Sequence, residues 1–131
     1  MTILLTGATG FVGRNLLLSL LKEKKYGAIF LPVRDVSKLE EQLRQEGYDS
    51  VPPEVKAFRS EADDWKLNED AARATHVVHA AGVIFARTRA EYWQTNTEGT
   101  LRLFRALKNP SQIVVLSSLA AAGPSSAKHV R

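Results

Sequence analysis

The stretch TGATGFVG, residues 6–13, constrains the fold of this chain more strongly than any other part of the sequence. It follows a short apolar run, ILL, and precedes an amphipathic run, FVGRNLLLSLLKEK, so its three glycines lie where a strand would turn into a helix. Glycines at this spacing and in this context are typical of a loop that binds the phosphates of a dinucleotide. An ordinary glycine-rich turn is the alternative interpretation.

Each glycine of the stretch has its own expected role. Gly7 would allow a tight turn with a positive φ, Gly10 would let the backbone approach a pyrophosphate, and Gly13 would let the helix pack closely on the strand. The first N–H groups of that helix would face the phosphates, and two threonine hydroxyls would add contacts. The predicted cofactor-binding residues of the stretch are Thr6, Gly7, Thr9, Gly10, Phe11, Val12 and Gly13.

Length and composition indicate one folded domain over residues 1–131. A hydrophobic content of 44% and a charged content of 24% are those of a globular protein. No apolar run reaches the roughly 18 residues of a spanning helix, and the start, MTILLTG, leaves no space for a secretory signal peptide. We therefore expect a cytoplasmic protein that does not bind membranes.

Residue types exclude several other chemistries. The chain has no cysteine, so it forms no disulfide and performs no thiol chemistry, and its three scattered histidines do not predict a metal site. We interpret His76 and His79 as packed structural residues. The net charge of +4 is modest, and the basic residues are spread over helix faces, so no nucleic-acid partner is expected.

Short β-branched runs alternate along the chain with longer helical patterns, which indicates βαβ units and a parallel sheet. We predict an α/β fold with a doubly wound parallel sheet in the order 3-2-1-4-5 and helices on both faces. The predicted strands are 2–6, 28–33, 55–58, 75–81 and 112–118; the predicted helices are 11–24, 37–47, 66–73 and 89–107; residues 119–131 are a loop and tail.

Local signals predict where some of these elements end. Ser37, followed three residues later by Glu40, matches a capping box that would open the second helix, and Gly47 would close it. Gly27 would end the first helix. Pro32 cannot donate a hydrogen bond to a neighbouring strand, so we place it near the end of the second strand.

Four motifs in sequence order resemble the extended short-chain dehydrogenase/reductase superfamily. They are TGATGFVG (6–13), HAAG (79–82), EYWQTNTEGT (91–100) and LSSLAAAGPS (116–125). The chain is most similar to the NAD-dependent epimerase/dehydratase family and its dihydroflavonol-reductase-like and 3β-hydroxysteroid-dehydrogenase-like branches. The resemblance covers nearly the whole chain and implies that residues 1–131 form an NAD(P)-binding Rossmann-type domain.

The chain departs from that superfamily in one respect. Its members carry a Tyr-x-x-x-Lys pair beyond the last serine motif, whereas this sequence stops at Arg131 and Tyr92 is followed four residues later by Asn96. The resemblance therefore implies the amino-terminal portion of a longer enzyme, truncated before the remaining strands and the substrate subdomain. We expect the chain alone to be inactive.

The residues after the second strand bear on the choice of cofactor. Arg34 lies about where an acidic residue would bind the adenosine ribose in an NAD protein. A guanidinium there suits a 2′-phosphate, and Lys38 follows one helical turn later. This favours NADP(H) over NAD(H). Two alternatives stay open: Asp35 holds the ribose hydroxyls of NAD, or Arg34 is a solvated surface residue.

Two further segments are expected beside the cofactor. Glu61 and Asp63 follow the third strand, where the superfamily has an acidic residue near the adenine amino group; two exposed acidic residues at the start of a helix are the alternative. The small residues Ala80, Ala81 and Gly82 would let the ribose and pyrophosphate approach the edge of the sheet, as the resemblance implies.

Asn96 and Ser118 are the predicted catalytic residues. Asn96 and Gly99 lie within a helical pattern that neither residue favours, and the matching Asn of the superfamily supports the cofactor and catalytic groups; an ordinary polar position is the alternative. Ser118 matches the catalytic serine by its spacing to Gly123 and would polarise the substrate oxygen. Its neighbour Ser117 is expected at the cofactor.

The function that this resemblance implies is hydride transfer between NADP(H) and a carbonyl or alcohol carbon of a small-molecule substrate. A sugar-nucleotide epimerase or dehydratase that retains its NAD(P), and a non-catalytic nucleotide-sensing or interaction module, are alternatives. The loop 83–89 would line the substrate side of the cleft. An exposed apolar fifth strand would permit a homo-oligomer.

Overall fold

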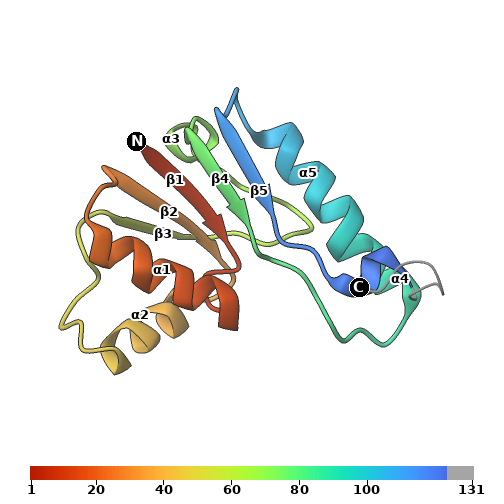
Figure 1. Ribbon diagram of the computed structural model, residues 1–131, viewed down its shortest axis with the longest axis horizontal. Helices are drawn as coiled ribbons and strands as arrows, with labels where there is room; N and C mark the ends of the chain where they lie inside the picture. Colours follow the sequence, from red (N-terminus) through yellow and green to blue (C-terminus); the bar gives the residue numbers. More distant parts are fainter. Residues whose placement is uncertain (124–131) are drawn as a thin grey trace, which may run out of the picture.

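Five parallel strands form one sheet in the order β3-β2-β1-β4-β5, as predicted (Figure 1). A computed structural model of the chain describes residues 1–123; the end of the predicted tail, with Pro124 and Ser125 of the fourth motif, lies outside the described residues. The sheet is Rossmann-like, and its strand order reverses between β1 and β4. The strands are β1 (Thr2–Thr6), β2 (Ala28–Val33), β3 (Val55–Arg59), β4 (His76–His79) and β5 (Gln112–Val115).

Helices cover both faces of this sheet, because side chains along each strand alternate between the two faces. On one face, α1 and α2 pack leucines against Ile3 and Leu5 of β1. On the other face, Leu4 packs with Ala71 of α3 and Leu103 of α5. The helical segments are α1 (Phe11–Glu23), α2 (Val36–Gln45), α3 (Glu69–Ala72), α4 (Arg89–Tyr92), the π-helical η1 (Trp93–Glu98), α5 (Gly99–Ala106) and the 3₁₀-helical η2 (Leu119–Ala122).

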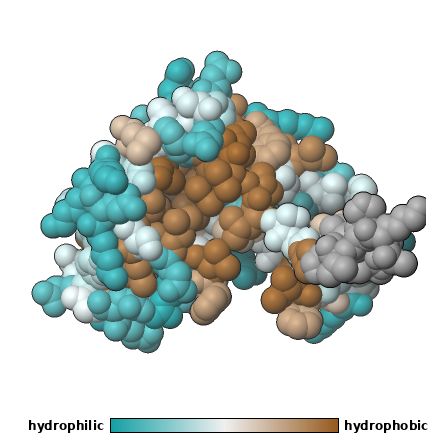
Figure 2. Space-filling view, in the orientation of Figure 1, coloured by the Kyte–Doolittle hydropathy of each residue, from teal (hydrophilic) through white to brown (hydrophobic). Residues whose placement is uncertain are grey.

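The strand β5 is less covered than the others. It is the last strand of the sheet and pairs only with β4. Ile113, Val114 and Val115 are 41%, 44% and 45% exposed, and Figure 2 shows apolar side chains gathered over β1, β4 and β5. Within residues 1–123, the longest helix has 13 residues, and none has the length and apolarity of a membrane span.

Two predicted helix ends are wrong. The second helix begins at Val36, and the Asp35 carboxylate caps it by accepting a 3.1 Å hydrogen bond from the backbone N–H three residues later. Ser37 therefore lies inside the helix and opens no capping box with Glu40. A carboxylate satisfies a free N–H and also faces the positive end of the helix. The first helix ends at Glu23, and its C-cap is Lys24 in the left-handed conformation (φ 52°), not Gly27.

Several other boundaries differ from those predicted. The strands β4 and β5 end at His79 and Val115, before the small and polar residues that complete their motifs. The third helix has only four residues, starting after the capping residue Asn68. The predicted helix 89–107 is interrupted by η1. Pro32 is the second-to-last residue of β2, beyond the part paired with β1, as its missing N–H suggested.

Candidate cofactor site

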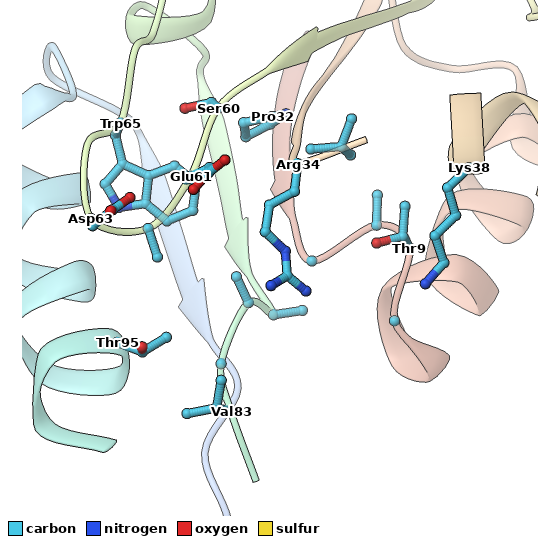
Figure 3. Close-up of a pocket in the computed structure, with 18 of the residues that line it drawn as sticks. Thr9, Pro32, Arg34, Lys38, Ser60, Glu61, Asp63, Trp65, Val83 and Thr95 are labelled. Atoms are coloured by element: carbon cyan, nitrogen blue, oxygen red, sulfur yellow. The ribbon is translucent and has the colours of Figure 1, made fainter. Parts of the chain in front are cut away.

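A cleft of about 490 Å³ lies at the carboxyl ends of the strands, where ligands bind in open α/β sheets (Figure 3). It includes nine residues that the sequence predicted for the cofactor. These are Gly7, Thr9, Gly10, Arg34, Lys38, Glu61, Ala80, Ala81 and Gly82. The cleft is also lined by Ala8, Pro32, Val33, Ser60, Ala62, Asp63, Trp65, Val83, Gln94 and Thr95.

The glycine-rich loop after β1 is held by contacts that exclude a side chain. Gly7 has a φ of 75°, and a Cβ on it would lie 2.6 Å from the carbonyl carbon of Ala80. A Cβ on Gly13 would overlap the Gly7 carbonyl oxygen. A Cβ on Gly10 would meet only that oxygen, at 3.3 Å. Gly7 and Gly13 therefore set the backbone packing, while Gly10 leaves the loop surface open.

The amino end of α1 adjoins this loop and has no anionic partner within residues 1–123. Gly10 is its N-cap, no side chain caps it, and its first turn contains no acidic residue. The N–H groups of Phe11, Val12 and Gly13 bond to no acceptor in the part of the chain that the structure describes. Phe11 and Val12 do not line the main cleft, and the Phe11 side chain is 87% exposed. This end of α1 suits a phosphate.

Two cations line the cleft on the side of β2 and α2. In Figure 3 the Arg34 guanidinium reaches into the middle of the cleft, and Lys38 extends past Thr9. Neither side chain forms an ion pair within residues 1–123. Asp35 does not line the cleft, because its carboxylate caps α2. The structure thus brings the two predicted cations together and directs the competing carboxylate elsewhere.

The opposite wall is the loop after β3. Glu61 and Asp63 both line the cleft (Figure 3). The Glu61 carboxylate lies 3.6 Å from the guanidinium of Arg59. The indole N–H of Trp65 donates a 2.7 Å hydrogen bond to the Gly99 carbonyl. Trp65 was missed by the sequence reasoning, although a large aromatic side chain directly after the acidic residues was an available signal.

The helix α2 also holds the glycine-rich loop, through a residue that the sequence did not single out. The Gln42 side-chain N–H donates a 3.1 Å hydrogen bond to the Thr9 carbonyl. Gln42 lies one turn after Lys38 on α2. An ion pair between Arg14 of α1 and Glu46, the C-cap of α2, joins the two helices that flank the loop. No sequence signal marks a polar side chain that bonds to a backbone carbonyl of a distant loop.

Thr6 does not reach the cleft. Its side chain is fully buried, and its hydroxyl lies 2.6 Å from Nδ1 of His79 and accepts a 3.2 Å hydrogen bond from the Ala81 N–H. Burial lowers the pKa of His79, because removing the ring from water disfavours its charged form. The Thr6 hydroxyl is therefore used to hold the chain after β4, and the structure offers it no direct phosphate contact.

Asn96 lies just beyond the cleft, in the π-helical segment η1. Its side-chain carbonyl accepts a 2.8 Å hydrogen bond from the Val83 N–H, and its amide donates to the Val83 carbonyl at 2.9 Å. A Cβ on Gly82 would lie 3.2 Å from the same side-chain oxygen. Asn96 thus holds the cleft wall at Val83 through both backbone groups of that residue. Short π-helical segments occur often at functional sites, and no sequence pattern predicted this one.

The two predicted serines lie outside the cleft. Ser117 and Ser118 are exposed residues of the segment between β5 and η2. The Ser118 hydroxyl accepts a 3.2 Å hydrogen bond from the Ala120 N–H and so caps η2. The structure does not bring either serine to the residues that line the cofactor cleft.

Solved structures share this fold. Gre2 from Candida albicans in complex with NADPH has a TM-score of 0.75 and 21% identity, covering 92% of this chain and 38% of its own. A mutant uronate dehydrogenase from Agrobacterium tumefaciens complexed with NAD has a TM-score of 0.63 and 20% identity. The match covers 89% of this chain and 40% of the dehydrogenase. Pen from Bacillus thuringiensis has a TM-score of 0.69 and 22% identity. The match covers 92% of this chain and 39% of Pen. The chain spans about two fifths of these proteins.

Sequence comparison gives the family directly. Curated protein sequences provide no significant match. The family model described as "NAD dependent epimerase/dehydratase family" matches residues 3–130, which include the glycine-rich loop, the cleft and both predicted catalytic residues. Because this match extends over nearly the entire chain, the chain belongs to the NAD-dependent epimerase/dehydratase family.

Proposed function

We propose that this chain is the NADP(H)-binding domain of an extended short-chain oxidoreductase. When bound, the nicotinamide cofactor supplies or accepts the hydride that reduces a carbonyl or oxidises an alcohol. The observation that carries the proposal is one cleft with an uncapped helix end beside it and two unpaired cations in its wall. These features match the pyrophosphate and the 2′-phosphate of the cofactor.

The preference for NADP(H) rests on charge. Arg34 and Lys38 present two positive charges to the cleft, whereas the carboxylate of Asp35 caps α2. A guanidinium forms charge-assisted, often bidentate hydrogen bonds with a phosphate. The similar solved structures do not decide the matter, because one is a complex with NADPH and another with NAD.

Removing the Arg34 charge tests this preference. Arg34→Gln should weaken NADPH binding by roughly ten- to a hundredfold, since a charged hydrogen bond contributes about 1.5–3 kcal/mol. The affinity for NADH should change little, and isothermal titration calorimetry measures both. Arg44→Gln is the matched control: it removes one charge from α2 at a residue that does not line the cleft. An equal loss of NADPH and NADH affinity would refute the assignment of Arg34 to the 2′-phosphate.

Ser118 and Asn96 have catalytic roles in this proposal. The Ser118 oxygen accepts a hydrogen bond from Ala120, so its own proton is available to polarise a substrate oxygen. Asn96 supports the cleft wall beside the loop 83–89. Tyr92 donates its hydroxyl proton to the Ile84 carbonyl at 2.8 Å and has no lysine four residues later. We propose that the chain alone binds the cofactor without completing turnover.

An epimerase or dehydratase is the second candidate, because the matching family model is described by those activities. In such an enzyme the cofactor is oxidised and reduced within one cycle and stays bound. The two candidates separate on whether the whole protein, purified without added cofactor, retains nicotinamide. Retention through many turnovers supports the epimerase or dehydratase, while stoichiometric consumption of NADPH supports the reductase.

A further inference from the structure

His79 lies at the centre of a hydrogen-bonded chain that joins two parts of the cofactor site. Its side chain is 3% exposed and does not line the cleft. Nδ1 lies 2.6 Å from the Thr6 hydroxyl, and Nε2 lies 2.9 Å from the Thr100 hydroxyl. The ring also meets Trp65 edge to face, with centroids 6.1 Å apart. Both ring nitrogens are therefore engaged, one towards Thr6 of β1 and the other towards Thr100 of α5.

The surrounding hydrogen bonds determine which ring nitrogen carries the proton. Thr100 donates its hydroxyl proton to the backbone carbonyl of Asn96 at 2.7 Å, so towards His79 it can only accept. Nε2 of His79 must then be protonated. Burial lowers the pKa of His79 and so favours the neutral ring, and a neutral ring protonated at Nε2 accepts the Thr6 proton at Nδ1. The Thr6 oxygen in turn accepts the N–H of Ala81.

The two ends of this chain hold the backbone of the cleft. On one side, Thr6 fixes the N–H of Ala81, whose peptide packs against Gly7 of the glycine-rich loop. On the other side, Thr100 bonds to the backbone carbonyl of Asn96, and the Asn96 side chain pairs with both backbone groups of Val83. Ala81 and Val83 both line the cleft and are separated only by Gly82. Two routes therefore connect the Gly7 contact with the Asn96 contact: the hydrogen bonds of the His79 ring, and the backbone from Ala81 to Val83.

We propose that His79 is a positioning residue that couples the glycine-rich loop to the Asn96–Val83 contact, so that cofactor binding orders Asn96. The proposal rests on the proposed cofactor binding and adds a pathway from the phosphate end of the cleft to a catalytic residue. His79 acts through Thr6 and Thr100 and does not touch the cofactor.

Amide hydrogen exchange measured by NMR on the chain without cofactor tests the two ends separately. An Asn side chain can replace the acceptor Nδ1, and a Gln side chain can replace the donor Nε2. We expect His79→Asn to speed exchange at Val83 by roughly five- to tenfold and to spare Ala81. His79→Gln should have the opposite pattern. Equal acceleration at both amides, or at neither, would overturn the proposal.

A milder pair of variants tests the coupling to the cofactor without disturbing the ring. NADPH should slow exchange at Val83 in the unmodified chain. Thr100→Val should abolish that protection while changing NADPH affinity less than about twofold, and Thr100→Ser should restore it. Thr97→Val is the matched control, because the Thr97 hydroxyl in η1 takes part in no hydrogen bond among the described residues.

The binding and exchange measurements distinguish a failure of the His79 coupling from a failure of the proposed NADPH binding. If NADPH fails to bind, the proposed function is wrong, and the cofactor-free exchange of Ala81 and Val83 still tests the positioning role of His79. If NADPH binds and Thr100→Val keeps the protection at Val83, the coupling is refuted and the cofactor assignment stands.

Discussion

The segments that follow β1 and β5 both leave the carboxyl edge of the sheet, with β4 between the two strands, yet they differ in how they are held. The loop after β1 packs its backbone against β4 and α1, at Gly7 and Gly13, where no side chain fits. The segment after β5, which includes η2, carries exposed residues, with Leu119 70% exposed. Its Leu116 N–H bonds to the His79 carbonyl of β4, and its side-chain capping bond is local to Ser118 and Ala120. The first loop is shaped by contacts between backbones, whereas the second has few contacts within residues 1–123.

This difference shows why one half of the predicted site is assembled and the other is not. Gly7 and Gly13 have no side chain, so the close backbone atoms around them determine the shape of the first loop. A serine at a strand end takes its direction from whatever packs around it, and β5 has a neighbour on one side only. Cofactor binding should therefore depend on the first loop and be insensitive to the second.

The largest effect is expected from filling the space at Gly13. Gly13→Ala places a methyl group against the Gly7 carbonyl, and because both partners are backbone, neither can move alone. We expect a loss of about 3 kcal/mol in the free energy of unfolding, the upper end of overpacking costs. Urea denaturation followed by circular dichroism measures it.

The matched control is Gly47→Ala. Gly47 has a φ of 91° and open space where a Cβ would lie, so this substitution costs only the strain of a left-handed residue, about 1–2 kcal/mol. If Gly13→Ala proved as mild as this control, the first loop would not be held by close backbone packing.

A smaller effect is expected at β5, where exposed valines on an edge strand favour association between copies of the chain. Val114→Lys should weaken self-association by roughly tenfold, about 1.4 kcal/mol, as measured by analytical ultracentrifugation. Gln112→Lys adds the same charge at a polar, exposed position of β5 and should change association less. A chain that stays monomeric at high concentration would contradict the prediction.

The smallest effects come from removing one hydroxyl from each loop. Thr9→Ala should weaken NADPH binding by about fivefold, the value of one hydrogen bond of about 1 kcal/mol. Ser118→Ala should leave that affinity unchanged and cost about 0.5 kcal/mol of stability, the low end for a capping residue. Fluorescence titration with NADPH compares the two variants, and a weaker affinity for Ser118→Ala than for Thr9→Ala would reverse the comparison.

Much of the fold could be predicted from the sequence, because its signals are local. The alternation of strands and helices predicted the sheet order, and the spacing of Gly7 and Gly13 predicted a turn with positive φ and a close packing of helix on strand. The N-cap of α2 was harder to predict, because Asp35 and Ser37 are both residues that cap helices well. The spacing of Ser37 to Glu40 favoured Ser37, whereas the helix begins one residue after Asp35.

The rest of the site depends on contacts between distant residues. The Gln42 side chain bonds to Thr9, and Trp65 bonds to Gly99, across 33 and 34 residues of sequence. The π-helical segment around Asn96 also has no periodic signature in the sequence. Arg102 of α5 donates one hydrogen bond to the carbonyl of Ala62, in the loop after β3, and one to the carbonyl of Gln94, within η1.

The central claim is that the cleft binds NADP(H) through Arg34 and Lys38. Calorimetric titration of the unmodified chain with NADPH and NADH, at one salt concentration, tests it most directly. We predict that NADPH binds at least about tenfold more tightly, from the charged hydrogen bonds to the 2′-phosphate. Equal affinities, or tighter binding of NADH, would contradict the account.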